Sequence, residues 1–143
     1  MSSIREAALV ALLAAVRLVP GATVQRETVV PEAVPPGGLI ILRDGVPGEP
    51  ETTLSPLTYH YEHAARLEVM VQGAGAGPRA AHLDNLLVAL GHVLAADRTL
   101  GGAVEWLDWA APETDDLALP AVAAVKGALV TVVLVYSTRN PLW

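Results

Sequence analysis

The clearest pattern of hydrophobic and polar residues runs from Leu57 to Gln72, with the sequence LTYHYEHAARLEVMVQ. Its odd-numbered positions are mostly apolar or aromatic, and its even-numbered positions are mostly polar. This period of two predicts a strand with one buried and one wetted face. At about 3.3 Å per residue the strand would exceed the usual length. We therefore expect it to bend at a bulge near Ala64 and Ala65 or to project beyond its sheet.

Two other stretches have helical spacing. Ser3 and Glu6 fit a capping box, and apolar residues then recur at helical intervals as far as Val16. A second helix is predicted over residues 79–96, with Pro78 at its first position. Its apolar stripe consists of Leu83, Leu86, Leu87, Leu90, Val93 and Leu94.

Shorter apolar runs predict further strands over residues 23–30, 38–43, 104–109 and 125–137. The last run is apolar on both faces, which is typical of a central or doubly covered strand. Turn signals after Arg43 predict that Glu51–Leu54 returns antiparallel and closes a hairpin with a Pro-stiffened tip.

No linker in the chain is long enough to divide it, so we expect one domain over residues 1–143. The expected fold class is α+β: a mostly antiparallel sheet with two main helices packed on it and a projecting β-hairpin.

Composition narrows the chemistry. The 143 residues are 52% hydrophobic and include no cysteine, which excludes disulfides, Cys-ligated zinc and thiol catalysis. The net charge of −6 leaves no basic stripe for holding nucleic acid, although nucleic acid could slide past such a surface. No apolar run approaches the roughly 20 residues of a membrane span. Glu6, in place of a basic segment, argues against a signal peptide.

The most enzyme-like feature is the glycine-rich turn Gly73–Gly77 before the second predicted helix. Such a turn can bind phosphate through backbone amides and the helix dipole. However, Pro78 stands where the dinucleotide fingerprint needs a third glycine, and no P-loop lysine follows. A flexible connection is the simpler interpretation, and a phosphorylated or CoA-like ligand is the alternative.

Few other residues suggest catalysis. His60 and Glu62 share a strand face and could ligate a metal, but the sequence offers no third ligand. His63, on the apolar face, is expected to be a hydrogen-bonded, half-buried histidine. No nucleophile elbow supports Ser55 or Ser137. We therefore expect no catalytic residue, no metal and no cofactor.

The segment between Arg98 and Lys126 contains no basic residue. A solvated rim is the simplest interpretation, and an acidic docking surface or channel wall is the alternative. Its candidate residues are Glu105, Asp108, Glu113, Asp115 and Asp116.

Several phrases of the sequence resemble one family: PPGGLIILRDGVPGEPE, LSPLTYHYEHAARLEVMVQ, LAADRTLGG and the closing Val-Leu-Val-Tyr-Ser-Thr strand. The chain is similar, over nearly its whole length, to the tail-completion (tail terminator) proteins of long-tailed phages, prophages and gene-transfer particles, of the minor tail protein U type. The resemblance implies a structural virion protein without enzymatic activity. Such proteins form a ring, commonly a homohexamer, that caps the tail tube, ends its polymerisation and joins it to the head connector.

The resemblance also implies a location at the head-proximal end of the virion tail, after assembly in the host cytoplasm. The implied partners are further copies of the chain, the tail tube protein and a head–tail connector or stopper protein. DNA would pass through the lumen without specific binding, and no membrane is involved.

Two sets of residues are candidates for these roles. The expected contact residues are Arg43, Asp44, Glu49, Glu51, Tyr59, Tyr61 and Trp143. We expect the lumen to be lined by the acidic stretch from Glu105 to Asp116 or by the hairpin tip. The alternatives are another neck protein, such as a stopper or adaptor, or less favourably a small enzyme binding its ligand at Gly73–Gly77.

Overall fold

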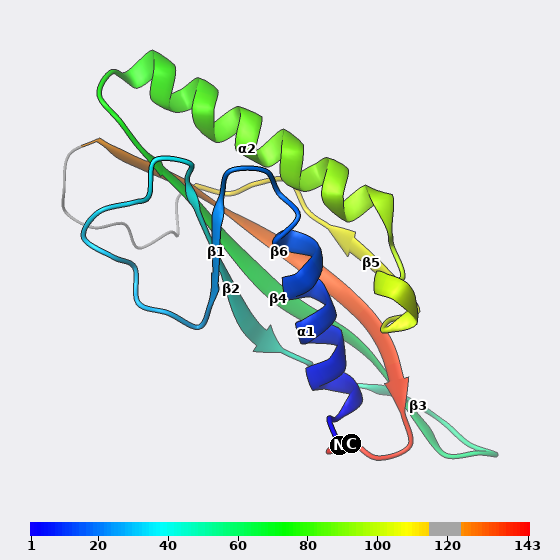
Figure 1. The fold of residues 1–143 in the computed structure, drawn as a ribbon. Helices are drawn as coiled ribbons and strands as arrows, with labels where there is room; N and C mark the ends of the chain where they lie inside the picture. Colours follow the sequence, from blue (N-terminus) through cyan, green and yellow to red (C-terminus); the bar gives the residue numbers. More distant parts are fainter. Residues whose placement is uncertain (115–123) are drawn as a thin grey trace.

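The computed structural model describes residues 1–114 and 124–143 as one α+β unit (Figure 1). The helices are α1 (Ile4–Val16), α2 (Ala76–Ala96) and the short 3-10 helix η1 (Leu100–Gly102). The strands are β1 (Thr23–Arg26), β2 (Leu39–Val46), β3 (Glu51–Thr53), β4 (Thr58–Gln72), β5 (Trp106–Trp109) and β6 (Val125–Thr138). They form one sheet in the order β1-β2-β4-β6-β5, and β3 pairs with β4. The β1–β2 pair is parallel and the other pairs are antiparallel, so the predicted fold class is confirmed.

The two longest strands, β4 and β6, form the centre of the sheet. They pair without interruption from Tyr59 opposite Thr138 to Gln72 opposite Val125. The long strand predicted to start at Leu57 is therefore present, although it begins at the next residue. The prediction that the last strand is central is also confirmed, because β6 lies between β4 and β5.

The bulge expected in the long strand near Ala64 and Ala65 lies instead in the neighbouring strand β2, opposite these residues. The register between β2 and β4 shifts between Arg43 and Val46, which is a β-bulge. Gly45 lies in this bulge with a positive φ of 66°. A Cβ atom at Gly45 would lie 1.8 Å from the carbonyl oxygen of Ala64, so the close approach of the two strands requires glycine.

The prediction of a hairpin between residues 43 and 54 is wrong, because β2 and β3 do not pair with each other. After the bulge, β3 continues in the same direction as β2 and pairs with β4. The chain therefore returns at the turn Leu54–Leu57, and the hairpin of β3 and β4 projects beyond the rest of the sheet (Figure 1). Pro47 and Pro50 explain the error. They lack the N–H donors of a strand ladder, so they mark a break between two strands on the same edge rather than a reversal.

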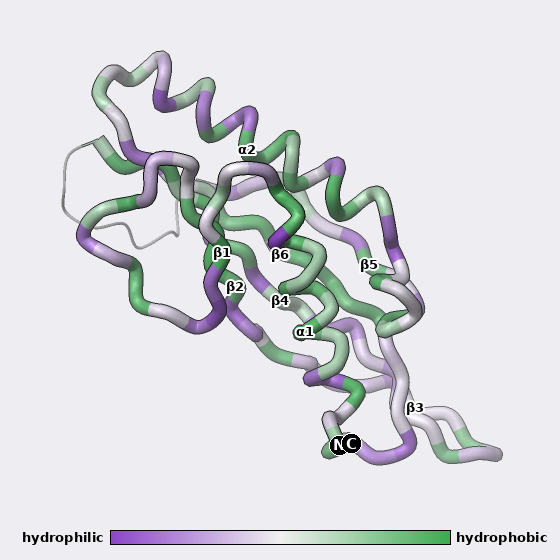
Figure 2. The backbone as a smooth tube through the Cα atoms, viewed as in Figure 1, coloured by the Kyte–Doolittle hydropathy of each residue, from purple (hydrophilic) through white to green (hydrophobic). Residues whose placement is uncertain are grey.

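Both helices pack on the same face of the sheet (Figure 1). Helix α1 starts as predicted, because Ser3 is the N-cap and its Oγ accepts the Glu6 N–H at 3.0 Å. Helix α2 starts at Ala76, earlier than predicted, and includes Pro78 in its first turn. In Figure 2, α2 alternates between hydrophobic and hydrophilic segments, as a helix with one buried side does. Among residues 1–114 and 124–143, no helix is long and apolar enough to cross a membrane.

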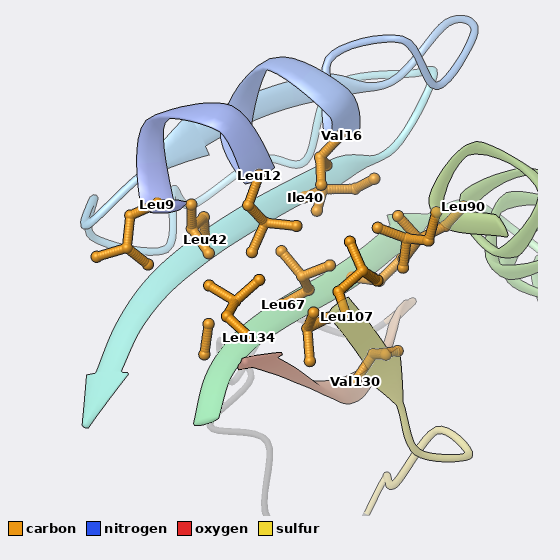
Figure 3. Packing of buried hydrophobic residues seen from close by; sticks show 14 of the residues in the cluster. Leu9, Leu12, Val16, Ile40, Leu42, Leu67, Leu90, Leu107, Val130 and Leu134 are labelled. Carbon is orange, nitrogen blue, oxygen red and sulfur yellow. The ribbon is translucent and has the colours of Figure 1, made fainter. Parts of the chain in front are cut away.

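The main core fills the space between the helices and the sheet. In Figure 3, side chains of α1 lie above those of the central strands, and Leu90 approaches from α2. The residues of this packing include Leu9, Leu12, Val16, Ile40, Leu42, Leu67, Leu90, Leu107, Val130 and Leu134. Each is less than a tenth exposed, so hydrophobic burial holds the two layers together.

The opposite face of the sheet carries no helix within the described residues, and we call it the helix-free face. The segment between β1 and β2 covers one end of it, where Val34 packs with Leu39, Ile41 and Met70. The Val34 N–H donates to Gln72 Oε1 at 2.8 Å, which holds the segment in place. The rest of this face presents the polar positions of β4 beside half-buried positions of β6.

The backbone of β5 is already bonded on the side away from β6. The Leu107 N–H donates to the Arg98 carbonyl at 2.9 Å, and Arg98 Nη1 donates to the Leu107 carbonyl at 3.2 Å. The Trp109 N–H donates to the carboxylate of Asp108 at 2.9 Å. The Arg98 guanidinium also lies 4.8 Å from the ring centre of Trp106 and 4.4 Å from that of Trp109.

The bulge provides a stability test with an internal control. Gly45→Ala should lower the free energy of unfolding by about 3 kcal/mol or more, because the new Cβ collides with the backbone of β4. Gly48 has a similar positive φ of 73°, and nothing lies near the position of an added Cβ atom. Gly48→Ala should therefore lower the free energy of unfolding by about 1 kcal/mol. Urea unfolding followed by circular dichroism measures both. Equal losses would show that the bulge is not tightly packed.

Candidate functional site: an acidic trough on the helix-free face

An open, acidic hollow of about 530 Å³ lies at the hairpin end of the helix-free face, and we call it the acidic trough. Its carboxylates are Glu49, Glu51, Glu62 and Glu105, and its other lining residues are Thr53, His60, Tyr61 and Val135. Strand pairing brings these residues together. Glu51 lies opposite His60 across β3 and β4, and Glu62 lies opposite Val135 across β4 and β6. The Glu105 N–H donates to the Val135 carbonyl at 2.8 Å, which fixes the wall on the β5 side.

The trough is negative because its carboxylates lack cationic partners. Within the described residues, none of its four glutamates forms a salt bridge. Glu105 accepts a hydrogen bond from the Ser137 hydroxyl at 2.9 Å, and His60 Nε2 lies 2.9 Å from Thr53 Oγ1. Like charges in an open hollow produce a negative potential that repels anions.

The trough does not have the geometry of a metal centre. His60 and Glu62 both line it, as their shared strand face predicted. Across residues 1–114 and 124–143, however, no group of three His, Asp or Glu side chains is arranged to hold an ion. What the arrangement can do is present charge over an open surface.

The structure joins two sets of candidates that the sequence kept apart. Glu49 and Glu51 were expected as contact residues, whereas Glu105 was expected in an acidic rim, and all three line the same trough. Asp108 lies on the neighbouring strand and pairs with Arg98 at 3.4 Å. The other three acidic candidates lie away from the trough or beyond the described part: Glu113 bridges to Leu129 of β6, and Asp115 and Asp116 lie outside the described residues.

Arg43 and Asp44, expected at a subunit contact, form ion pairs within the subunit. Arg26 of β1 donates to both Asp44 oxygens, at 2.8 and 2.9 Å, and to both Glu6 oxygens, at 2.7 and 2.9 Å. Arg43 donates to Glu68 of β4 at 3.0 Å. These side chains therefore connect α1, β1, β2 and β4.

Electrostatics agree with this internal role. The hydrogen bonds donated by Arg26 lower the pKa of Glu6, and donating to Glu6 and Asp44 raises the pKa of Arg26. Bidentate pairs of this kind fix orientation as well as charge. Charge reversal at Asp44 would thus disturb the fold together with any surface contact.

Tyr61, another expected contact residue, belongs to the core. Its side chain lies on the helix side of the sheet, is 7% exposed, and its ring centre is 5.7 Å from that of Tyr136. Tyr59 is half-buried and packs against the same core. Trp143, in contrast, is 63% exposed, and the neighbouring Leu142 is 79% exposed. Of the three aromatic residues expected at contacts, Trp143 is the one exposed to a partner.

His63 is hydrogen-bonded, as predicted, and it is fully rather than half-buried, at 1% exposure. Its Nε2 contacts the Asp44 carbonyl, and its Nδ1 lies 2.8 Å from the Tyr136 hydroxyl. Because a carbonyl can only accept, Nε2 carries the proton and Nδ1 accepts from Tyr136. Burial lowers the pKa of His63 and raises the pKa of Tyr136 to about 12.

The glycine-rich turn leads into α2, with Gly75 as its N-cap. No side chain caps this helix start. Arg79 Nη1 donates to the Gly73 carbonyl at 2.9 Å, so the one nearby cation of the helix closes the turn. This geometry accounts for the turn as a connection between β4 and α2.

Glu62 is a trough residue that the sequence does not reveal as one of the acidic candidates. Its sequence position suggests only a possible metal pair with His60. The signal that could have identified Glu62 is its position on the polar face of β4, which pairs with the strand that begins at Glu51.

No model of a protein family matches the chain, and no curated protein matches it significantly.

The buried histidine predicts a pH dependence of stability. The pKa of His63 in the folded protein is below its ordinary value of 6.5. As pH falls, the unfolded chain therefore binds a proton at this residue before the folded protein does. The stability contributed by the neutral, buried His63 is fully present above pH 6.5 and is lost as the pH falls below 6.5. Urea unfolding should therefore show a free energy of unfolding that decreases as the pH is lowered from about 7.5 to about 5.

His63→Gln should flatten this pH dependence, whatever its effect on stability at pH 7. The matched control is His92→Gln, because His92 is exposed on α2. An unchanged pH slope in His63→Gln would contradict the assignment.

Proposed function

We propose that this protein is a tail terminator: a structural subunit that forms a ring, caps a tail tube and joins it to a head connector. The resemblance of the sequence covers nearly the whole chain, and the α+β fold is of the class which that resemblance implies. The proposed mechanism is mechanical. A closed ring leaves no unpaired subunit surface around its circumference, and its flat face blocks further addition of tube subunits.

The acidic trough is the observation that carries this proposal. A ring around the path of a genome needs a wall that does not retain DNA, and unpaired carboxylates repel phosphates. Glu49, Glu51, Glu62 and Glu105 are collected from three separate parts of the chain onto one open face. We assign this face to the lumen of the ring.

The subunit contacts follow from which candidate side chains are free. Arg43, Asp44 and Tyr61 stabilise the subunit itself, so we do not assign them to partners. Trp143 and the projecting hairpin remain as contact elements. The hairpin extends beyond the sheet, where it can reach a neighbour (Figure 1).

The first test is assembly. Purified protein should elute at about six times the 14.9 kDa subunit mass on a sizing column with light scattering. Negative-stain images should show rings, and with tail tubes added, density at one tube end. A lone subunit that leaves tube ends bare would overturn the proposal.

The same images separate the alternatives. A stopper or adaptor would bind the connector and leave tube ends free. A small enzyme using the Gly73–Gly77 turn would instead show a thermal shift with nucleotides or CoA, and Gly75→Val would remove that shift.

The second test concerns the lumen. Glu62→Lys places one new lysine per subunit in the trough, so the ring should bind short duplex DNA about tenfold more tightly at low salt. Fluorescence anisotropy measures this affinity. Asp84→Lys makes the same charge change on an exposed position of α2 and is the matched control. Equal increases in both variants would show that the trough does not face the DNA.

A further inference from the structure

The β-bulge of β2 is held in place by side chains as well as by strand pairing. The register between β2 and β4 passes over Asp44 and Gly45, so these residues lack the regular partners of a ladder. The Asp44 N–H instead donates to Glu27 Oε1 at 2.7 Å, and the Asp44 carbonyl accepts from His63 Nε2. The Asp44 carboxylate accepts from Arg26 at 2.8 and 2.9 Å. Every hydrogen-bonding group of Asp44 is therefore satisfied by a side chain, and one of these side chains is a buried histidine.

The surroundings of His63 suit a neutral ring. The residue is 1% exposed, and its Nδ1 accepts from the Tyr136 hydroxyl at 2.8 Å. A proton on Nδ1 would face the hydrogen of that hydroxyl. Among the described residues, the Tyr136 hydroxyl has no second partner toward which its hydrogen could turn. A charged His63 therefore needs water, which the closed structure does not admit.

The charges around His63 do not compensate a proton on its ring. Burial has the largest effect and lowers the pKa of His63. Asp44 of β2 favours the charged ring, but its carboxylate is already ion-paired, and Arg5 of α1 opposes the charge. Tyr136 of β6 is neutral, because burial raises its pKa to about 12. Tyr61 of β4 lies beyond it, with 5.7 Å between the two tyrosine ring centres.

The bulge is the part of the cover over His63 that opens most easily. We call residues 44–53 the bulge segment, and it contains the bulge and β3 (Figure 1). None of its residues is buried, and β3 pairs only with β4 among the described strands. The other covers of the ring, α1 and β6, contribute many residues to the main core. A segment with few buried apolar contacts opens at a lower free energy than the whole protein unfolds.

We propose that His63 is a pH-sensitive latch for the bulge segment: in an acidic medium this segment detaches from β4 and lets water reach the protonated ring, while both helices and the β4–β6 pair stay folded. Glu49 and Glu51 belong to the segment, so its opening removes two carboxylates from the acidic trough. The latch operates within one subunit and does not depend on the proposed ring.

Hydrogen–deuterium exchange followed by mass spectrometry tests the latch on the wild-type protein. Peptides of the bulge segment should lose about tenfold in protection between pH 7.5 and pH 5.5, after correction for the chemical exchange rate at each pH, because the open form takes up the proton more readily. This exchange should not change in low, non-denaturing urea, since a local opening exposes little surface. Peptides of β5, which β6 separates from β4 and His63, should keep their protection.

Two variants identify the titrating group. His63→Gln removes the imidazole and supplies an amide that can donate to the Asp44 carbonyl, so the bulge segment should exchange with equal protection at both pH values. His60→Gln is the matched control, because His60 Nε2 lies 2.9 Å from Thr53 Oγ1 of the same segment, and it should retain the tenfold change. The wild-type experiment decides the question even if His63→Gln does not fold.

Three results would overturn the latch. Protection of the bulge segment that does not change with pH excludes it. A loss of protection equal to that of α2, with the same dependence on urea, shows that the whole protein unfolds instead. A pH effect that disappears in His60→Gln places the sensor on the trough side of β4. Ring formation and tube capping are measured separately, so none of these results decides the tail terminator proposal.

Discussion

The continuous antiparallel pairing of β4 with β6 is the constraint on which the rest of the structure depends. Every residue from Tyr59 to Gln72 is matched with one from Val125 to Thr138. The period of two along this ladder directs one set of side chains toward the helices and the other toward the helix-free face. A slip of one residue would exchange the two sets, so the core and the acidic trough are fixed by the same register.

Much of this fold could be predicted from the sequence because local patterns specify it. The alternation after Leu57 and the cap at Ser3 each depend on residues close together in the chain. The partner of β3 could not be predicted in this way. Turn signals at Asp44 and Gly45 are compatible with a reversal, but they form a bulge here, because the strand continues along the same edge of β4. Such a choice is decided by tertiary packing.

The candidate site was predictable only in parts. The acidic character of Glu105 and the polar face containing Glu62 are visible in the sequence, but their proximity is created by pairing between distant strands. The roles of Asp44 and Tyr61 were beyond sequence reasoning for a related reason. A charged or aromatic residue near a turn looks exposed until its partner, Arg26 or Tyr136, is located in space. The trough is therefore a property of the register rather than of any motif.

The bonding of β5 restricts how copies of this protein can associate. Its outward N–H groups at Leu107 and Trp109 are occupied by Arg98 and Asp108. A strand from another molecule would find no free donor at these positions and could not extend the sheet there. Copies can meet at this edge only through side chains, and contacts of that kind are limited by shape. Such contacts leave the rotation between copies to be set by side-chain shape, and that rotation decides whether an assembly closes, whereas a strand added at the edge would simply extend the sheet.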